Sequence, residues 1–222
     1  KRQFAESDKQ HALERFGMTC FVANHPIDED ELEFDHIEAF ARGGESDRDN
    51  IAPVCKHHNR AKRDMTLLEY RDKLALDTFF DTPSPRILND VLAQRGIKFG
   101  QRIYSEPDTS QTQIVLTEEN GKKSVFPLYQ DAVTGYFYFY ARLPVACIQN
   151  DKELQPRPLE MQRLWQLYRH LRNHTQLSPS IGRLVDNQIL IFDGQHKIAA
   201  QVWAGQSHVD CKIYLDPNIH DI

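Results

Sequence analysis

The 222-residue chain has no long apolar run, and this absence excludes a helical membrane protein. No stretch approaches the roughly 18 consecutive apolar residues that a membrane-spanning helix needs. A charged N-terminal segment followed by an apolar one, as in an export signal, is also missing. We therefore expect a cytoplasmic protein with no membrane contact. Because the chain begins with Lys1 and not with Met, we expect it to be a piece of a longer protein.

Cysteine is scarce as well. The four cysteines are spaced unevenly, at Cys20, Cys55, Cys147 and Cys211. Small secreted domains that depend on disulfides carry denser and more regular sets. The sequence therefore excludes a disulfide framework and indicates a reducing compartment.

Positive charge is also in short supply, because the formal net charge is −5 at pH 7. This balance excludes a protein that coats nucleic acid, but it does not exclude a nuclease, since steering of DNA depends on local charge. Six carboxylates gather in residues 28–35, whereas residues 55–63 carry four cations and no anion. We interpret the acidic run as a solvated face, with Asp35 as the exception.

Patterning predicts an α+β fold in three parts, with a β-rich connecting segment in the middle. These parts are an N-terminal domain (1–80), the connecting segment (81–140) and a C-terminal α/β domain (141–222). The segment "TPSPR" (82–86) breaks the helical pattern and marks the first boundary. Expected helices cover residues 7–16 (with Ser7 as N-cap), 55–80, 86–95, 158–174 and 195–205. Expected strands cover residues 31–37, 102–106, 112–118, 124–130, 135–141, 143–149, 181–194 (two strands) and 208–216.

The aromatic run 136–140 is interpreted as a strand packed on both faces. A platform on which nucleic-acid bases stack is the alternative reading of the same residues.

The most informative stretch is "EFDHIEAFARGGESDRDNIAPVCKHHNRAKRD", residues 33–64. Its "DHI" (35–37), "GG" (43–44), "DNI" (49–51) and "VCKHHNRAK" (54–62) resemble, in order and spacing, the ββα-metal core of the HNH endonucleases. The resemblance covers about residues 17–65. It implies an N-terminal HNH domain that hydrolyses phosphodiester bonds in DNA.

The resemblance also assigns roles. His36 is the expected general base, because imidazole takes up a proton near neutral pH. Asp35 and Asn59 are expected to offer oxygen ligands to Mg²⁺ or Mn²⁺, and Asn50 is expected to tie the loop that orients His36. Many family members have His where this chain has Asn59, so the pattern is an H-N-N variant. Cations on the following helix are expected to contact DNA phosphates: Arg60, Lys62 and Arg63. Taken one at a time, His36 and Asn59 would more simply cap a strand and a turn.

A second metal site is suggested by Cys20-x4-His25 and Cys55-x2-His58. Two thiolates and two imidazoles suit a tetrahedral structural Zn²⁺. Related proteins often carry Cys-x2-Cys pairs at this place, and His57 is a possible substitute for His58. The alternative is two buried thiols among surface histidines.

The second informative stretch is a strand that leads into Asp193-Gly194-Gln195-His196-Lys197 and then directly into a helix. It resembles the DGQHR motif of ParB/sulfiredoxin-like domains, over roughly residues 141–216, with Lys197 in place of the usual Arg. A glycine turn at a helix N-terminus exposes N–H groups to an anion. Lys197 and Arg157 would add positive charge around the phosphates of a nucleotide or of DNA. The alternative is a helix cap in which Asp193 bonds to its own turn.

Together these motifs predict a metal-dependent DNA endonuclease joined to a ParB-like domain that senses phosphate or nucleotide, for restriction of foreign DNA. A zinc-stabilised regulator that binds nucleotide and DNA without cleavage is one alternative. A nucleotide hydrolase centred on residues 193–197 is the other. It lacks the GxxxxGK[ST] loop that such enzymes commonly use.

Overall fold

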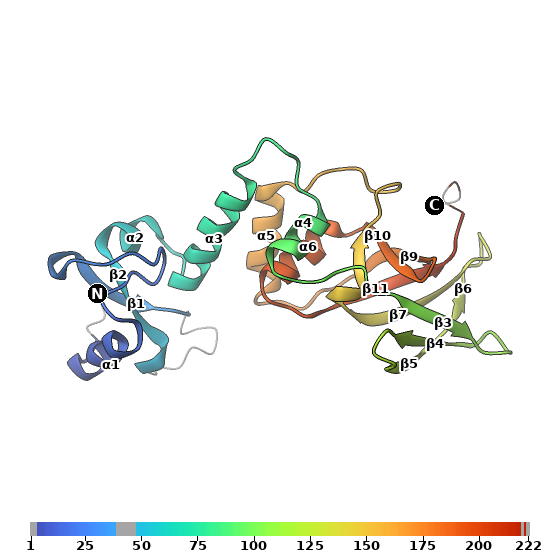
Figure 1. The fold of residues 1–222 in the computed structure, drawn as a ribbon, viewed down its shortest axis with the longest axis horizontal. Coiled ribbons are helices and arrows are strands. Elements are labelled where there is room, and N and C mark those ends of the chain that lie inside the picture. Colours follow the sequence, from blue (N-terminus) through green and yellow to red (C-terminus); the bar gives the residue numbers. More distant parts are fainter. Residues whose placement is uncertain (1–3, 39–47, 219, 221–222) are drawn as a thin grey trace. The chain divides into compact units, whose positions relative to one another are not determined.

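The computed structural model describes residues 4–38, 48–218 and 220. The chain forms two compact units, Lys1–Asp81 and Thr82–Ile222, and the division between them falls beside the "TPSPR" segment. The α+β class predicted from the sequence is confirmed, with a small ββα unit at the N-terminus and a β-rich remainder (Figure 1). None of the helices in the described residues is long and apolar enough to cross a membrane.

The N-terminal unit consists of three α-helices, two short 3-10 helices and one antiparallel pair of strands in its described part. In chain order these are α1 (Glu6–Phe16), η1 (Glu29–Glu31), β1 (Leu32–His36), η3 (Arg48–Asn50), β2 (Ile51–Cys55), α2 (Lys56–Ala61) and α3 (Leu67–Phe80). Its core is a compact apolar cluster in which two thiols take part: Cys20, Val22, Ile27, Ala52, Val54, Cys55 and Leu67.

The ends of these helices follow from the local sequence. Helix α1 ends at Gly17, which adopts a φ of 64° and whose N–H bonds to Leu13 O at 2.8 Å. The expected N-cap, Ser7, is wrong, because the helix begins at Glu6 and its N-cap is Ala5. Helix α3 begins with a capping box, in which Thr66 and Glu69 each accept the backbone N–H of the other.

A six-stranded mixed sheet forms the centre of the C-terminal unit, in the order β6-β7-β11-β9-β10-β8. Its strands are β6 (Tyr129–Gln130), β7 (Phe137–Pro144), β8 (Ile148–Asn150), β9 (Ser180–Val185), β10 (Gln188–Asp193) and β11 (His208–Leu215). The pairs β11–β9 and β10–β8 are parallel, and the other pairs are antiparallel. The boundary expected between residues 140 and 141 falls inside β7, because that strand pairs with β11 along residues on both sides of it.

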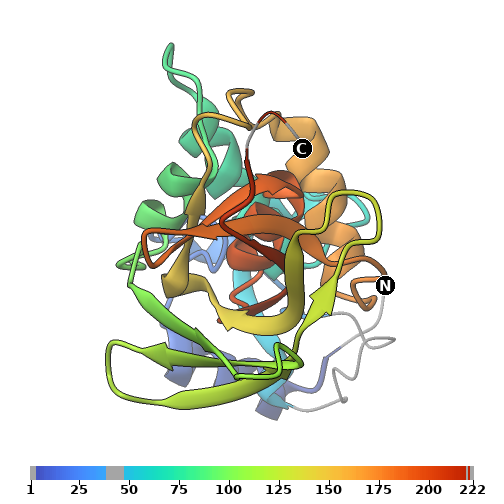
Figure 2. The same cartoon turned by 90° about the vertical axis from the view of Figure 1, so that its right-hand side faces the viewer.

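A smaller antiparallel sheet, β3-β4-β5, lies beside the six-stranded one (Figure 2). Its strands are β3 (Ile103–Pro107), β4 (Gln113–Glu118) and β5 (Lys123–Pro127). The rings of Phe126 on β5 and Phe139 on β7 stack with their centroids 6.0 Å apart, which joins the two sheets.

Three α-helices and one 3-10 helix complete the described part of the unit: α4 (Leu88–Gln94), η4 (Val145–Cys147), α5 (Met161–Leu171) and α6 (Gln195–Trp203). Helix α6 contacts α4, α5 and strand β9, and eight of its nine residues are buried. Such a helix is a rigid base for the loop at its N-terminus, which is the DGQHK segment.

Strand β7 alternates between the core and solvent, so the expectation of packing on both faces is wrong. Phe139 is fully buried, whereas Tyr140 is 48% exposed. The outward rings of Tyr138 and Tyr214 flank Lys212, whose ammonium lies 4.0 Å and 4.6 Å from their centroids. This face is therefore an aromatic surface that is only partly covered.

A tight turn between β9 and β10 precedes the strand that leads into the DGQHK segment. Asp186 and Asn187 both adopt positive φ values, 51° and 63°. Two such residues in succession are typical of the tight turn that matches the twist of a hairpin. Strand β10 then ends at Asp193, directly before α6.

Candidate functional site

The N-terminal candidate site is built by β1, β2 and α2. In the antiparallel register Asp35 lies opposite Ala52 and His36 opposite Ile51, so both residues stand at the end of β1. Helix α2 follows β2 without a gap, because Cys55 both ends the strand and caps the helix by accepting His58 N–H at its sulfur. The expected glycine pair, Gly43–Gly44, lies outside the described residues.

Asp35 and His36 are both partly exposed, with 30% and 23% of their side chains open to solvent. Asp35 Oδ1 accepts the His36 backbone N–H at 2.8 Å, and the His36 Nδ1 atom lies 3.7 Å from the same oxygen. The ring of Phe4 contacts the imidazole edge-on, with centroids 4.9 Å apart. Consecutive residues of a strand point to opposite faces. The carboxylate and the imidazole therefore face different sides of β1 but meet at its end.

Asn50 forms a two-point clamp on the backbone just beyond His36. Its Oδ1 accepts Glu38 N–H at 2.8 Å, and its Nδ2 donates to Glu38 O at 3.0 Å. Its own carbonyl accepts Ile37 N–H at 2.9 Å. Three hydrogen bonds thus fix the backbone of Ile37 and Glu38, directly after His36. The role expected for Asn50, to tie the loop that orients His36, concerns this same part of the chain.

Asn59 projects from α2 towards β1 and meets a residue that the sequence analysis had assigned to the solvated face. Asn59 Nδ2 donates to Glu33 Oε2 at 2.7 Å. Glu33 and Asp35 are two residues apart on the strand and therefore share one face. The alternation of side chains along a strand could have predicted this from the sequence, because it places Glu33 on the face of Asp35 and not with the exposed carboxylates before it.

Lys62 differs from its expected role at a DNA phosphate. Its side chain is only 11% exposed, and its Nζ lies 2.8 Å from Asp35 Oδ2 and 3.0 Å from Met65 O. The ammonium therefore neutralises the Asp35 carboxylate inside the unit and does not face solvent. The reason is geometric, because Lys62 comes three residues after Asn59 and so faces β1 as Asn59 does.

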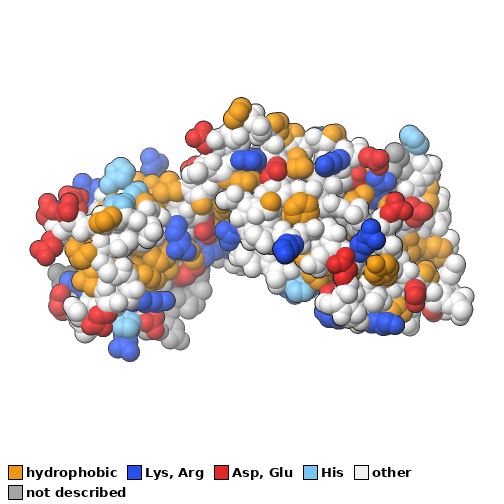
Figure 3. Space-filling model, in the orientation of Figure 1, with side chains coloured by type: hydrophobic (Ala, Val, Ile, Leu, Met, Phe, Trp, Pro, Cys, Tyr) orange, Lys and Arg blue, Asp and Glu red, His pale blue; other side chains and the backbone are white. Residues whose placement is uncertain are grey.

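Arg60 and Arg63 fit the expected role better. Both are exposed, and together with Lys56 and His57 they line a shallow hollow that also includes Glu31. Asp and Glu side chains gather instead at one end of the N-terminal unit on the face that Figure 3 shows. The net negative chain thus carries a local group of cations on the helix that follows the candidate site.

The predicted cysteine and histidine ligands form one cluster. The ligand atoms of Cys20, His25, Cys55 and His58 all lie within 4.8 Å of one another. The two sulfurs are 3.9 Å apart, which excludes a disulfide and compares with about 3.8 Å for two sulfurs on one tetrahedral zinc ion. His58 Nδ1 lies 3.5 Å from Cys20 Sγ and 3.1 Å from Cys55 Sγ. His57 is exposed and stands outside this cluster, so it does not replace His58.

The chemistry of these four residues fits a metal ion. His25 Nδ1 lies 2.7 Å from Pro26 O, an acceptor, so Nδ1 carries the proton and Nε2 is left to bind a metal. Burial lowers the pKa of His58, and the neighbouring His57 and His25 lower it further, which keeps this imidazole neutral. Burial also raises the pKa of the Cys55 thiol, against the opposing effect of the His58 backbone N–H. A bound metal cation would stabilise the thiolate form of the two cysteines.

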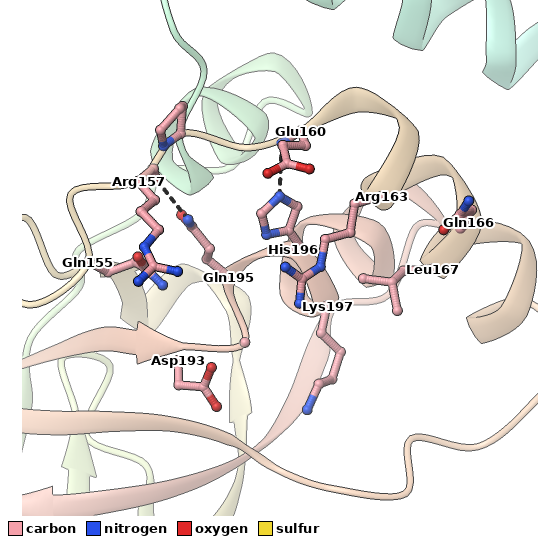
Figure 4. Close-up of a pocket in the computed structure, with 12 residues that line it drawn as sticks. Gln155, Arg157, Glu160, Arg163, Gln166, Leu167, Asp193, Gln195, His196 and Lys197 are labelled. Atoms are coloured by element: carbon pink, nitrogen blue, oxygen red, sulfur yellow. Dashed lines mark hydrogen bonds between the residues drawn. The ribbon is translucent and has the colours of Figure 1, made fainter.

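The C-terminal unit contains a separate pocket of about 590 Å³ around the DGQHK segment (Figure 4). It is lined by Gln155, Arg157, Pro158, Glu160, Arg163, Gln166, Leu167, Asp193, Gly194, Gln195, His196 and Lys197. The volume is within the range of small-molecule sites, about 300–1,000 Å³.

The side chains of Gln195 and His196 bind the backbone of residues 157–160, which forms one wall of this pocket. Gln195 Nε2 donates to Arg157 O at 2.8 Å, and His196 Nε2 accepts Glu160 N–H at 2.8 Å. Both residues are buried. The polar ends of these side chains therefore fix the 157–160 segment, although Gln195 Oε1 is buried with no hydrogen-bond partner in the described chain.

Gly194 and Lys197 shape the floor. Gly194 has a φ of 85°, and a Cβ there would lie 2.6 Å from Ser180 Oγ, so only glycine fits. Lys197 Nζ donates to Ser178 O at 2.8 Å and also lies within 3.3 Å of Pro179 O. The Asp193 carboxylate makes no hydrogen bond to its own turn within the described residues, so the simple cap reading does not hold.

Two guanidinium groups, from Arg157 and Arg163, and the carboxylate of Asp193 surround the same space in Figure 4. No role was expected for Arg163. Its place in the first turn of α5, off the apolar stripe of that helix, was the feature of the sequence that indicated an exposed cation there. Burial lowers the pKa of His196, and Arg163 lowers it further. Burial likewise lowers the pKa of Lys197, which Asp193 opposes.

Comparison with known proteins bears directly on the N-terminal geometry. Residues 20–64 match the family model described as HNH endonuclease. Residues 20–64 form an HNH domain. The matched segment holds β1, β2 and α2 together with Asp35, His36, Asn50 and Asn59.

No curated protein matches the chain. One solved structure that it resembles is the C-terminally truncated chromosome-partitioning protein ParB from Caulobacter crescentus complexed with CTP-gamma-S, at 18% sequence identity and a TM-score of 0.33. The match covers 36% of this chain and 46% of that chain, so it spans less than half of the ParB structure.

The structure brings most of the predicted residues of the HNH domain together. Asp35, His36 and Asn50 gather at the ends of β1 and β2, and Asn59 is joined to the same strand through Glu33. The Cys₂His₂ set lies in the same unit, with its two cysteines in the core and its two histidines partly buried.

Proposed function

We propose that this protein is a metal-dependent DNA endonuclease whose HNH site is formed by Asp35, His36, Asn50 and Asn59. The observation that carries the proposal is the Asn50 clamp, because an amide bonded at both ends to Glu38 has the geometry of a part that positions its neighbour His36. By the resemblance of both its motifs, we assign it to the restriction of foreign DNA.

The proposed chemistry is hydrolysis of a phosphodiester bond. His36 takes a proton from the attacking water, since imidazole has a pKa suited to a general base at neutral pH. Asn50 holds the backbone after His36, so that the ring keeps one direction towards the phosphate. Arg60 and Arg63 contact the DNA backbone from the exposed side of α2 and the residues after it.

Asp35 and Asn59 are the oxygen donors suited to Mg²⁺ or Mn²⁺. When bound, such an ion supplies positive charge that stabilises the phosphate as negative charge develops. Lys62 Nζ lies 2.8 Å from Asp35 Oδ2, so an ion bound there would share this carboxylate with the ammonium group.

We further propose that the cluster of Cys20, His25, Cys55 and His58 binds a structural Zn²⁺. Its four donors are two sulfurs and two nitrogens, and the two cysteines belong to the core of the HNH domain, whereas the two histidines are partly exposed. That unit has about 80 residues, a size at which a structural metal adds substantially to stability.

The pocket of the C-terminal unit is proposed to bind a nucleotide. Arg157 and Arg163 offer positive charge to phosphates. Asp193 and the unpartnered Gln195 Oε1 are acceptors, which suit hydroxyl and amino groups and not phosphate. A ligand with both kinds of group satisfies this lining better than a bare DNA phosphate does.

A regulator that binds DNA without cutting it is the second candidate. The ion pair between Lys62 and Asp35 favours it, because the carboxylate has a partner in the protein and needs no metal for charge balance. The two candidates differ in whether the site takes up a cation.

A plasmid-nicking assay tests the proposal. Supercoiled DNA should be converted to the nicked or linear form with Mg²⁺ or Mn²⁺, and not in EDTA. The same preparation should bind the plasmid in both conditions. Binding without any cleavage, over a panel of modified and unmodified DNAs, would overturn the endonuclease in favour of the regulator.

A further inference from the structure

Two carboxylates and two α2-side groups face each other across the gap between β1 and α2. Glu33 and Asp35 share one face of the strand. Asn59 donates to Glu33 at 2.7 Å, and Lys62 pairs with Asp35 at 2.8 Å. Glu33 thus contacts Asn59 directly, but no role follows for it from the HNH pattern set out above.

The contact decides which way the Asn59 amide points. A side-chain amide has an NH₂ donor at one end and an oxygen acceptor at the other, whereas an ionised carboxylate only accepts. The NH₂ group must therefore face Glu33, because the reverse orientation would place two oxygens against each other. A bond of 2.7 Å to an ionised acceptor is of the strong, charge-assisted kind.

With the NH₂ group held by Glu33, the Oδ1 atom of Asn59 is turned away from that carboxylate. An oxygen presented in a fixed direction is what a divalent cation needs from an amide ligand. Partners that orient a ligand in this way commonly change metal affinity by about 10- to 100-fold when removed.

We propose that Glu33 is a positioning residue that fixes the Asn59 amide with Oδ1 available to the divalent cation shared with Asp35. This inference rests on the proposed function, because it requires that Asp35 and Asn59 bind a cation. Glu33 acts through Asn59 and does not itself bind the metal or the DNA.

The test measures Mn²⁺ binding to the full chain by calorimetry, without DNA and with the cysteine site loaded with zinc. Glu33→Ala removes the acceptor and should weaken Mn²⁺ binding about tenfold or more. Glu33→Gln keeps an acceptor oxygen and should restore the affinity to within about threefold of the parent. Glu29→Ala, the same change on an exposed neighbour that Asn59 does not contact, should leave the affinity unchanged.

A thermal melt of each variant accompanies the binding measurement, so that a loss of fold is recognised. Equal Mn²⁺ affinity of the parent and Glu33→Ala would overturn the inference and leave the proposed function standing. Equal weakening by Ala and Gln would also overturn it, since charge and not amide orientation would then be responsible. If the parent binds Mn²⁺ and the variants behave as expected but no DNA is cut, only the proposed endonuclease activity is overturned. A folded parent that does not bind Mn²⁺ overturns both.

Discussion

Replacing Asn50 by alanine should damage cleavage far more than DNA binding. The Asn50 side chain makes two hydrogen bonds to the backbone of Glu38, at 2.8 Å and 3.0 Å. Each is worth about 0.5–1.5 kcal/mol net, so Asn50→Ala should lower the free energy of unfolding by about 1–3 kcal/mol. Because the bonds are only partly buried, the lower half of that range is the better expectation.

The loss also frees the backbone two residues beyond His36. A catalytic group that shifts by about 1 Å can cost about 100-fold in rate, so single-turnover plasmid cleavage should fall by roughly 10- to 100-fold. The dissociation constant for DNA should stay within about twofold, since the Asn50 side chain bonds to the backbone of Glu38 and is not one of the cations proposed to contact DNA. Asn173→Ala, on the exposed surface of the other unit, is the control and should change neither quantity.

Two results would refute this reasoning. Unchanged stability in urea would mean that the two bonds contribute nothing in solution. A variant that is destabilised as predicted but still cuts at the parent's rate would show that Asn50 does not position His36.

Three further predictions concern the zinc cluster and the nucleotide pocket. Elemental analysis should find about one zinc per chain, and Cys20→Ser should release it and lower the melting temperature of the N-terminal unit. A parent protein that contains no zinc, and whose melting temperature does not differ from that of Cys20→Ser, would contradict this. Arg163→Ala should weaken binding of a nucleotide by about 10- to 100-fold in calorimetry, and more than Lys197→Ala does, because Lys197 is already bonded to Ser178. Equal losses would mean that Arg163 is not the main contact. His196 has a lowered pKa, so the folded form binds fewer protons, and stability should fall as the pH drops below about 6.5. His196→Gln should flatten that dependence in thermal melts, and an unaltered pH profile would exclude His196 as its source.

The sequence was most informative where local chemistry dictates local structure. The order of "DHI", "DNI" and the helix bearing Asn59 predicted a ββα unit, and β1, β2 and α2 confirm it. The two strands expected over residues 181–194 are also confirmed as β9 and β10, and they are joined at Asp186 and Asn187, residue types that tolerate positive φ better than most others do.

Long-range order was harder to foresee. The boundary placed after Tyr140 divided a strand whose hydrogen bonds run to β11, some 70 residues later in the chain. Nothing in the local pattern shows which strand will be the partner, so a change in composition was mistaken for a boundary. The same limit explains why β7 was expected to pack on both faces, although Tyr140 is half exposed.

At the candidate site, residue types were easier to predict than directions. Lys62 was grouped with Arg60 and Arg63 by charge alone, yet its place three residues after Asn59 turns it towards Asp35. Glu33 was assigned to solvent with its acidic neighbours, although it lies on the Asp35 face. In both cases the period of the helix or strand, and not the charge of the run, determines where the side chain goes.

The most direct test of the central claim is single-turnover cleavage of plasmid DNA by His36→Ala in saturating Mg²⁺ or Mn²⁺. Removal of a general base should lower the rate by about 10²–10⁴ while DNA affinity and the thermal melt remain those of the parent. His174→Ala, an exposed histidine of the other unit, should cut at the parent's rate. Cleavage by His36→Ala at that same rate would contradict the assignment of an HNH active site to this protein.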